Sequence, residues 1–410
     1  MKQKPVHPPL SQFPVQDNQL VVAGLRFDDL LEQVDGTPFY AYDGLAIQQK
    51  VSQLRQQLPS DISLHYAIKA NPFAPVVKLL ASLVDGLDIA SAGELTLALD
   101  SGMSAAHISF AGPGKTDHEL RAAIEAGITL NVESTNELKR ISQHANILGI
   151  RPRVAIRVNP DFELKSSGMR MGGGAKPFGI DSEQVPGILM QLKTMDLEFR
   201  GLHIFSGSQN LQAEQIIAAQ NATFELAREI ALEADLALPT LNIGGGFGIP
   251  YFPGETALVL DPIAENLHRQ TTRWHEQMQN SEIILELGRY LVGEAGIYVC
   301  QVIDRKVSRG KTYLVVDGGL HHHLAASGNF GQIIRKNYPV INPQNLTGDS
   351  RETVTVVGPL CTPLDILADN MEMGKTDVAD YIAVLQSGAY GYSASPLGFL
   401  SHPLPGEYLF

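Results

Sequence analysis

The sequence has little of several features that define whole classes of proteins. Its 410 residues include two cysteines, one tryptophan and only 18% charged residues. The two cysteines, Cys300 and Cys361, are too few for a disulfide framework and are typical of a reducing compartment. No run of about eighteen apolar residues occurs, and residues 1–20 hold no apolar stretch of signal-peptide length. We therefore expect a cytoplasmic protein that has no membrane segment.

An excess of basic residues is also absent. The 31 Lys and Arg residues are outnumbered by 44 Asp and Glu residues, which gives a formal net charge of −13. Such a balance repels nucleic-acid phosphates and anionic lipid headgroups, so we expect neither a nucleic-acid partner nor a membrane-surface role. The chain does have 44% hydrophobic residues and enough length for a large core, which indicates a packed globular fold.

Short apolar runs alternate with helix-period segments over most of the first 290 residues, a rhythm that predicts βα units. The candidate strands are 63–67, 87–90, 108–111, 129–132, 153–158, 198–204, 240–243 and 283–287, and 213–233 is one of the helical segments between them. Eight such units are the number that closes a (β/α)8 barrel. We therefore predict an α/β protein in which residues 42–287 form this barrel.

After the eighth run the rhythm changes to closely spaced strands with few long helices. The candidate strands here are 296–303, 312–316, 354–357 and 380–384, and extended pieces also occur at 19–22 and 38–41. This pattern predicts a second, mostly β domain of sandwich or barrel type. We assign residues 288–410 to it, and residues 1–41 to N-terminal strands that pair with its sheet.

Chemically distinctive residues follow the predicted strands at their C-terminal ends, which form the catalytic end of a barrel. Lys69 follows the first strand, where an apolar run could desolvate its amine and lower its pKa for imine formation. Gly244, Gly245 and Gly246 follow the seventh strand and could aim backbone N–H groups at a phosphate. Glu286 ends the eighth strand and could keep a pyridine nitrogen protonated. A solvent-reaching lysine, a tight turn and a paired carboxylate are the simpler separate interpretations, but together the three supply what pyridoxal phosphate needs.

Other polar positions leave their role open. Asp88 is followed by Ser91 and Glu94, which either belong to a site or cap the next helix. Ser208 follows the sixth strand. Three histidines at 321–323 invite a metal, but neighbours on a strand point to opposite faces, so we do not expect a metal site.

Taken in order, these segments resemble the fold-type III pyridoxal-phosphate decarboxylases, which include the diaminopimelate, ornithine and arginine decarboxylases. The resemblance runs from about residue 40 to residue 399, and the order and spacing of its motifs are highly specific. The matching segments are YAIKAN at 66–71, DIASAGE at 88–94, GGG at 244–246, ELGR at 286–289, GPLC at 358–361 and GAY at 388–390.

The resemblance implies an alanine-racemase-like barrel joined to a β domain, in a homodimer whose active sites lie at the interface. Lys69 would hold pyridoxal phosphate as a Schiff base, Glu286 would pair with the pyridine nitrogen, and Asp88 and His203 would also contact the cofactor. Cys361 would serve the neighbouring subunit's site and donate a proton to the substrate carbon after CO2 leaves. The residues implied around the phosphate are Ser208, Gly244, Gly245, Gly246, Arg289 and Tyr390.

Two departures from the family's motifs concern the cofactor. Phe205 stands where the family usually has a histidine stacked on the cofactor ring, so the stacking would be apolar or rearranged. His203 lies two residues earlier and faces the same side of its strand, so it could substitute, although a structural histidine is an equally simple interpretation. Leu287 replaces a proline and affects geometry more than chemistry.

A third departure concerns the substrate. Relatives that act on amino acids with a distal amine commonly place an acidic residue after the cysteine, whereas Thr362 stands here and would leave a distal ammonium poorly compensated. The variants HIFSGSQ, ELGRYLV and GPLCTPLD resemble the branch that decarboxylates aminoacyl groups on acyl-carrier proteins, or the exosortase-associated branch. The alternatives are a diaminopimelate-type decarboxylase that acts on a free amino acid, a pyridoxal-phosphate racemase and a non-catalytic carrier of the cofactor.

Overall fold

The computed structural model describes residues 5–9, 12–162, 169–170, 172–348 and 350–410. The chain divides into two compact units. One, the barrel unit, comprises Lys50–Ile249 and Leu258–Gly288, and the other, the β unit, comprises Met1–Gln49, Pro250–Ala257 and Arg289–Phe410. The sequence placed residues 250–257 within the barrel segment, whereas their contacts lie in the β unit, because Tyr251 packs against Tyr338.

Eight parallel strands close the barrel. They are β5 (Ile62–Ala67), β6 (Gly86–Ile89), β7 (Ile108–Phe110), β8 (Thr129–Val132), β9 (Arg153–Asn159), β12 (Glu198–Ile204), β14 (Thr240–Gly245) and β15 (Glu282–Leu287). Pairing of β8 with β9, with Thr129 opposite Arg153, completes the ring. The short strand β11 (Ile180–Asp181) pairs in parallel with the end of β9. A separate two-stranded ladder joins β10 (Met169–Arg170) to β13 (Gly207–Ser208). The predicted fold class is confirmed, and each predicted barrel strand lies within two residues of an observed one.

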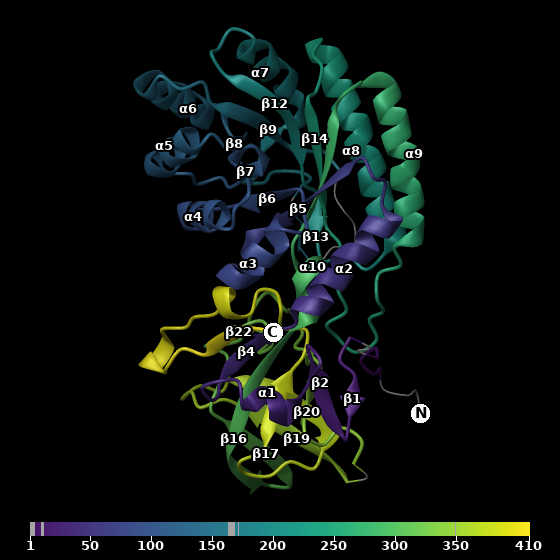
Figure 1. Ribbon diagram of the computed structural model, residues 1–410, viewed down its shortest axis with the longest axis vertical. Helices are drawn as coiled ribbons and strands as arrows, with labels where there is room; N and C mark the ends of the chain where they lie inside the picture. Colours follow the sequence, from purple (N-terminus) through teal and green to yellow (C-terminus); the bar gives the residue numbers. More distant parts are fainter. Residues whose placement is uncertain (1–4, 10–11, 163–168, 171, 349) are drawn as a thin grey trace. The chain divides into compact units, whose positions relative to one another are not determined.

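Helices surround the barrel strands (Figure 1). They are α2 (Gly44–Gln57), α3 (Ala74–Ala81), α4 (Ala92–Asp100), α5 (Asp117–Ala126), α6 (Thr135–Leu148), α7 (Val185–Leu192), α8 (Ala213–Ala234) and α9 (Asp261–Gln277), with short 3-10 turns η1 (Ile68–Ala70), η2 (Ala105–His107) and η3 (Ser182–Gln184). Polar residues fix several helix starts: Ser91, Thr116 and Ser134 each accept a hydrogen bond from the third residue of the helix that follows. These caps fix the first residues of α4, α5 and α6.

The β unit contains a sheet in the order β18-β21-β16-β17-β19-β20, with β4 and β22 joined through β16. Its strands are β4 (Phe39–Tyr42), β16 (Gly296–Ser308), β17 (Lys311–Val316), β18 (Val340–Ile341), β19 (Arg351–Val357), β20 (Ile366–Gly374), β21 (Tyr381–Val384) and β22 (Gly406–Leu409). A small sheet holds β1 (Val15–Gln16), β2 (Gln19–Val22) and β3 (Leu25–Arg26), followed by α1 (Phe27–Leu31). The remaining helical pieces are α10 (Arg289–Val292), η4 (Gly293–Ala295), η5 (Tyr392–Ala394) and η6 (Phe399–Ser401).

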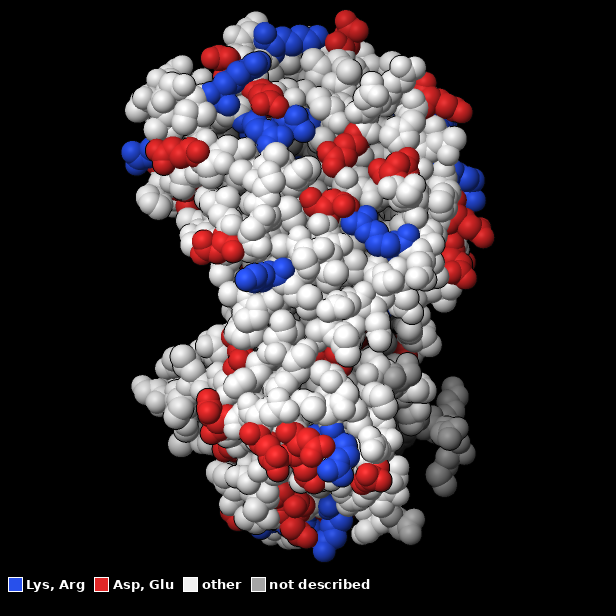
Figure 2. All heavy atoms as spheres, viewed as in Figure 1, with Lys and Arg blue, Asp and Glu red and all other residues white. Residues whose placement is uncertain are grey.

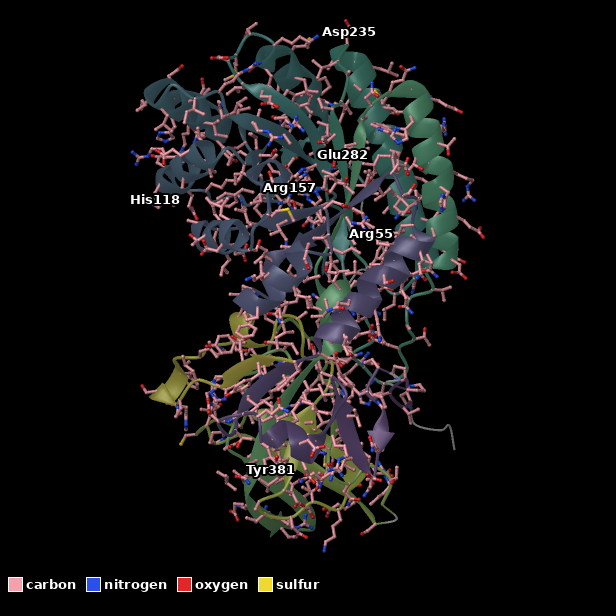
Figure 3. The ribbon with its side chains drawn as sticks, viewed as in Figure 1. Arg55, His118, Arg157, Asp235, Glu282 and Tyr381 are labelled. Carbon is pink, nitrogen blue, oxygen red and sulfur yellow. The ribbon has the colours of Figure 1, made fainter. Side chains whose placement is uncertain are left out.

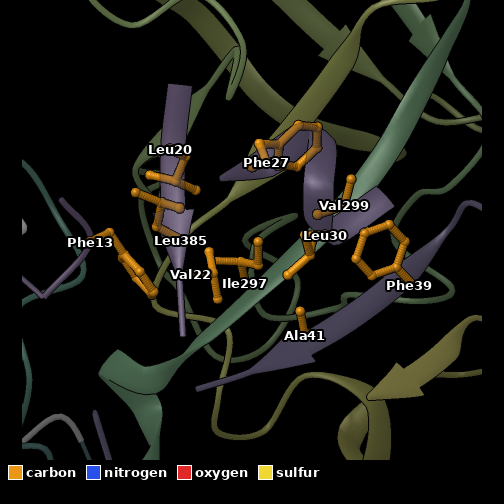
Figure 4. Packing of buried hydrophobic residues seen from close by; sticks show 11 residues of the cluster. Phe13, Leu20, Val22, Phe27, Leu30, Phe39, Ala41, Ile297, Val299 and Leu385 are labelled. Atoms are coloured by element: carbon orange, nitrogen blue, oxygen red, sulfur yellow. The ribbon is translucent and has the colours of Figure 1, made fainter. Parts of the chain in front are cut away.

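Both ends of the chain build the β unit. Strand β4 pairs with β16, with Tyr40 opposite Tyr298, so the predicted pairing of residues 38–41 with the C-terminal sheet is confirmed. The same prediction for residues 19–22 is wrong, because β2 pairs with its sequence neighbours β1 and β3. The core cluster of Figure 4 explains the arrangement, since Phe27 and Leu30 pack on Ile297 and Val299 and remove apolar surface of both chain ends from water.

Among the described residues, no helix combines the length and the apolar character that a bilayer crossing needs. On the face that Figure 2 shows, acidic and basic side chains are interspersed over the barrel and do not separate by sign.

Candidate active site

Lys69 lies just beyond β5, on the turn η1. The strand residues Tyr66 and Ala67 are buried, but the Lys69 side chain is exposed. The expectation that the apolar run desolvates this amine is therefore wrong, because the run positions the lysine at the strand end without covering it. The Lys69 Nζ lies 5.8 Å from the centre of the Phe205 ring, which follows β12. The structure thus brings an accessible amine and an aromatic face together at the C-terminal end of the barrel.

Glu286 supplies the buried carboxylate of the site. Its Oε2 lies 3.2 Å from Nε2 of His203 on β12 and accepts a 3.5 Å hydrogen bond from Nδ2 of Asn242 on β14. Burial would raise the pKa of Glu286, but the contact with His203 and the charges of Lys69 and Arg157 lower it to about 2. The carboxylate is therefore ionised at neutral pH, which is the state that holds a protonated pyridine nitrogen.

His203 contacts this carboxylate from inside the barrel. Its side chain is buried, and neither ring nitrogen makes a well-directed hydrogen bond to a described residue in spite of the short distance to Glu286. The ring beside the Lys69 amine is that of Phe205. Of the two side chains considered for stacking, the structure therefore brings Phe205 next to the lysine and His203 next to the acid.

The glycine segment after β14 is shaped by conformation and by close approach. Gly244 and Gly246 have φ values of 66° and 82°, a region that favours glycine. A Cβ on Gly244 would lie 2.8 Å from Cδ2 of Phe205, and a Cβ on Gly245 would collide with the carbonyl oxygen of Glu286. A turn of this kind can direct successive backbone N–H groups at an anion.

Asn242 links the glycine turn to the acid, and sequence reasoning missed it. Its Oδ1 accepts a 2.8 Å hydrogen bond from the N–H of Gly244, while its Nδ2 contacts Glu286. The signal for Asn242 was present, because an amide two residues before a left-handed glycine is a common turn partner.

Ser208, which the resemblance places near the phosphate, lies in β13, where it pairs with Met169.

Asp88 lies on β6 and is held inside the barrel. It accepts a hydrogen bond from Ser109 Oγ, and its Oδ2 is 3.3 Å from Nδ1 of His65. Burial lowers the pKa of His65, but the neighbouring carboxylates of Asp88, Glu282 and Glu286 together raise it, so the net shift is upward. Asp88 also lines the cavity that contains Lys69 and Glu286.

This cavity has a volume of about 310 Å³ and lies at the end of β5, β6, β7 and β9. Its charged lining includes two cations that sequence reasoning missed, Lys115 and Arg157. The Lys115 Nζ donates to Glu137 at 2.6 Å, and Arg157, labelled in Figure 3, donates to Glu133 at 2.9 Å. Both cations are therefore neutralised within the wall. Lys115 ends the segment GPGK after the third strand, so its position at a strand end was the signal that could have found it.

Arg289 and Tyr390 meet within the β unit. The Arg289 guanidinium carbon lies 4.6 Å from the centre of the Tyr390 ring and 5.6 Å from that of Tyr251. The Nη1 group donates a 3.1 Å hydrogen bond to the Tyr251 hydroxyl. The Nε atom is buried and has no hydrogen-bond partner among the described residues.

The two cysteines lie in different surroundings. Cys300 is buried in β16, and Cys361 is exposed in the β unit. Thr362 Oγ1 accepts a hydrogen bond from the N–H of Leu364, and the buried Asp365 accepts hydrogen bonds from backbone N–H groups on either side. The segment that follows Cys361 is thus tied into its own turn.

Ser91, Glu94 and the histidines at 321–323 make contacts within the fold. Ser91 Oγ accepts from the N–H of Glu94, and Glu94 accepts from the N–H of Ala90, so the capping role of these residues is confirmed. The three histidines at 321–323 lie in a turn, so the alternation expected of a strand does not apply. His322 Nε2 contacts the carbonyl of Pro403 and His323 Nε2 contacts Ser387 Oγ, which makes them part of the fold.

The residues present fit pyridoxal phosphate. An amine stands beside an aromatic ring, an ionised carboxylate is buried within the barrel, and a glycine turn faces the same barrel end. In the β unit, the buried and unmatched Nε of Arg289 suits an anion.

Comparison with known proteins gives a consistent result. Residues 45–293 match the family described as "Pyridoxal-dependent decarboxylase, pyridoxal binding domain". The chain is similar to L-glutamyl-[BtrI acyl-carrier protein] decarboxylase of Niallia circulans, with 39% identity covering 91% of this chain and 88% of the relative. It is similar to diaminopimelate decarboxylase of Aquifex aeolicus, with 34% identity covering 93% and 88%. The solved structure of Helicobacter pylori diaminopimelate decarboxylase complexed with L-lysine has a TM-score of 0.82 and 31% identity, covering 93% of this chain and 94% of that one.

Proposed function

Because this chain belongs to the pyridoxal-dependent decarboxylases, we propose that it removes the α-carboxylate of an aminoacyl group carried on an acyl-carrier protein. The chain is a carboxy-lyase that uses pyridoxal phosphate, which withdraws the electron pair that CO2 leaves behind. The observation that carries the carrier-linked substrate is the 39% identity, over 91% of the chain, to a relative named as a carrier-protein decarboxylase.

The segment after Cys361 supports this choice. A free diamino acid brings a distal ammonium, which needs a carboxylate partner in a desolvated pocket. Thr362 stands after the cysteine, and the nearby carboxylate of Asp365 is buried and accepts hydrogen bonds from Leu320 and Leu360. An amide-linked carrier arm has no such ammonium. A diaminopimelate-type substrate remains the second candidate, because a relative with that name is also similar over 93% of this chain.

The residues of the barrel have separate roles in binding the cofactor. Lys69 holds the cofactor's aldehyde carbon through its accessible amine, and Phe205 provides the apolar face beside it. Glu286, kept ionised by its neighbours, holds the proton on the pyridine nitrogen, and Asp88 and His203 also contact the cofactor. The groups that bind the phosphate are Ser208, Gly244, Gly245, Gly246, Arg289 and Tyr390.

Cys361 donates the proton to the substrate carbon, and a second copy of the chain supplies the enclosure that this step needs. Its surroundings support a homodimer: Leu364, Phe330, Ile333 and Ile334 are 58, 42, 102 and 77% exposed. The first two belong to segments joined by a hydrogen bond from Asn329 to the Leu364 carbonyl, so they lie near each other. Apolar side chains this exposed are typical of an interface.

The same thiol supports a cytoplasmic location. Cys361 is exposed and Cys300 is buried, and neither is in a disulfide. A proton-donating thiol at the surface stays reduced only in a reducing compartment.

The decisive experiment incubates the holoenzyme with a panel of free amino acids and of the same amino acids loaded on a carrier protein. Released CO2 and product mass are measured for each. We expect glutamyl-carrier turnover at least about tenfold above that of free diaminopimelate, lysine or ornithine. Turnover confined to the free diamino acids contradicts the carrier-linked substrate and leaves the decarboxylase assignment intact.

A paired variant sharpens this test. Thr362→Asp restores a carboxylate after Cys361, so it should raise activity on free diamino acids relative to the parent protein. Thr362→Ser serves as the matched control, because it keeps a hydroxyl and adds no charge. Equal activity of both variants on the diamino acids would show that the residue at position 362 does not recognise a distal ammonium.

A further inference from the structure

Arg289 is a buried cation that has no carboxylate partner among the described residues. Its side chain is 9% exposed. The described ion pairs do not include it, and its Nε lacks a described hydrogen-bond partner. An isolated buried charge is costly unless an opposite charge arrives to compensate it. The guanidinium is therefore prepared for an anion that is not part of the β unit.

Two tyrosines flank this cation instead of an acid. The Tyr390 and Tyr251 ring centres lie 4.6 and 5.6 Å from the guanidinium carbon, within the range of cation–π attraction. Tyr390 is held with φ at 53°, a conformation that costs free energy in a non-glycine residue and persists where the surroundings impose it. The aromatic rings hold the guanidinium plane in one orientation without neutralising its positive charge.

The Tyr251 hydroxyl adds a directed contact. It accepts the 3.1 Å hydrogen bond from Arg289 Nη1. A carboxylate in this position would neutralise the cation, whereas a neutral hydroxyl satisfies one N–H and keeps the charge available. The choice of tyrosine therefore suits a site whose ligand is an anion.

Tyr251 is itself firmly held. It is buried, its ring lies 4.7 Å from that of Tyr338, and its N–H donates a 2.8 Å hydrogen bond to Glu255. The carbonyl of the preceding Pro250 accepts a 2.9 Å hydrogen bond from Gln386 Nε2. These contacts fix the hydroxyl at one position, which is the property a positioning residue needs.

We infer that Tyr251 is a positioning residue for phosphate recognition, which holds Arg289 so that its remaining N–H groups meet the cofactor's phosphate. The inference rests on the proposed role of Arg289 in the proposed function. It predicts that Tyr251 affects the binding of the phosphate group and leaves the rest of the cofactor unaffected. That distinction can be measured, because pyridoxal differs from pyridoxal phosphate only in the phosphate.

The test compares the dissociation constants of pyridoxal phosphate and pyridoxal for the apoenzyme and its variants. Tyr251→Phe keeps the ring and removes the hydroxyl, so we expect it to weaken pyridoxal phosphate about tenfold, as expected for losing a hydrogen bond to a charged group, with pyridoxal unchanged. Tyr338→Phe is the matched control, because it removes a neighbouring hydroxyl that makes no described hydrogen bond with Arg289.

Arg289→Lys and the double variant give a second measurement. An ammonium cannot span the Tyr251 hydroxyl and the phosphate as a planar guanidinium does, so Arg289→Lys should lose a similar part of the phosphate preference. Adding Tyr251→Phe to it should cost nothing further, because the hydroxyl then has no guanidinium to hold. Additive losses, or an equal loss of pyridoxal and pyridoxal phosphate affinity in Tyr251→Phe, would overturn the inference.

The outcomes also separate the inference from the proposed function on which it rests. If Arg289→Ala keeps the full preference for pyridoxal phosphate, Arg289 does not bind the phosphate and that part of the proposed function fails. If Arg289→Ala loses the preference and Tyr251→Phe keeps it, only the role of Tyr251 is refuted.

Discussion

The barrel unit buries basic side chains beside acidic ones, whereas the β unit keeps most of its buried ionisable side chains neutral. Inside the barrel, four pairs of a basic and an acidic side chain have both members less than a tenth exposed: His65 with Asp88, Lys115 with Glu137, Arg157 with Glu133, and His203 with Glu286. No ion pair among the described residues of the β unit is buried this deeply. There, burial raises the pKa of Tyr40, Tyr298 and Cys300 and lowers that of His321, His322 and His323, so these groups stay neutral.

The physical reason is the cost of taking a charge out of water. A buried group either finds an opposite charge within hydrogen-bonding distance or stays neutral. One member of each barrel pair lines the cavity that contains Lys69, namely Asp88, Lys115, Arg157 and Glu286. Arg289 is an exception, a buried cation whose Nε has no hydrogen-bond partner among the described residues, which suits the anion-binding role proposed for it.

The largest effect should come from the amine that the barrel leaves accessible. Lys69→Ala should reduce decarboxylation by about a thousandfold or more, because no other described group at this position can hold the aldehyde carbon. It should also abolish the visible absorbance of the lysine-linked cofactor. Lys78→Ala, on the exposed face of α3, is the control and should retain both signals. Unchanged absorbance in Lys69→Ala would refute Lys69 as the anchor.

Breaking a buried pair should destabilise the barrel strongly. Glu137→Gln leaves the Lys115 ammonium buried beside two carbonyl groups without its counter-charge, so the free energy of unfolding should fall by about 3–5 kcal/mol. Urea unfolding of the holoenzyme measures this change.

The matched control breaks an exposed pair of the β unit. Glu372→Gln removes the partner of Arg351, and both side chains are largely exposed, so the loss should be about 1 kcal/mol or less. A similar loss for Glu137→Gln and Glu372→Gln would contradict the view that the barrel depends on paired buried charge.

Mild acid should weaken the β unit before the barrel. Burial lowers the pKa of His321, His322 and His323 to about 3, 4 and 3, against an ordinary value of 6.5. Below pH 6.5 the unfolded chain binds protons that the folded unit does not, so the free energy of unfolding falls as the pH drops toward 4. Hydrogen exchange of the β-unit strands at pH 7 and pH 5, followed by mass spectrometry, measures the change.

The barrel histidine His65 should respond in the opposite direction. Burial lowers its pKa, but Asp88, Glu282 and Glu286 together raise it above the ordinary value, so its stabilisation is complete below pH 6.5 and is lost as the pH rises through the folded pKa. The carboxylate of Glu286, with a pKa of about 2, loses its stabilisation only between about pH 4.5 and 2. Faster exchange in β5 and β15 than in β16 at pH 5 would contradict this ordering.

The smallest effect concerns a helix cap on the outside of the barrel. Thr116 Oγ1 accepts from the N–H of Glu119, whose carboxylate accepts from the N–H of Thr116. Thr116→Ala should lower the free energy of unfolding by about 1 kcal/mol, as measured in urea, and Thr116→Ser should restore most of it. A loss as large as that of Glu137→Gln would mean that α5 carries more of the barrel's stability than its exposed cap indicates.

Regular hydrophobic patterns made the barrel readable from the sequence. The eight strand positions follow from apolar runs that recur between helix-period segments, and Lys69, the glycines and Glu286 follow directly after or within those runs. Strands β1, β3 and β22 were not predicted, because short strands carry too few residues for a period to be recognised, whereas β2 was predicted at its observed bounds but with the wrong partner. Lys115, Arg157 and Asn242 were missed for a different reason: their importance lies in partners that come from other strands.

Local order and chemistry were thus encoded along the chain: the order of the strands, the amine after the first of them, the glycine turn and the acid at the eighth. The contacts between segments that are distant in the sequence were decided only by the tertiary structure. Packing places His203 against Glu286 and Phe205 beside Lys69, and it sets Arg289 between Tyr251 and Tyr390. Residues separated by dozens of positions meet only after the barrel closes and the β unit collapses, so no local period can specify which side chains become neighbours.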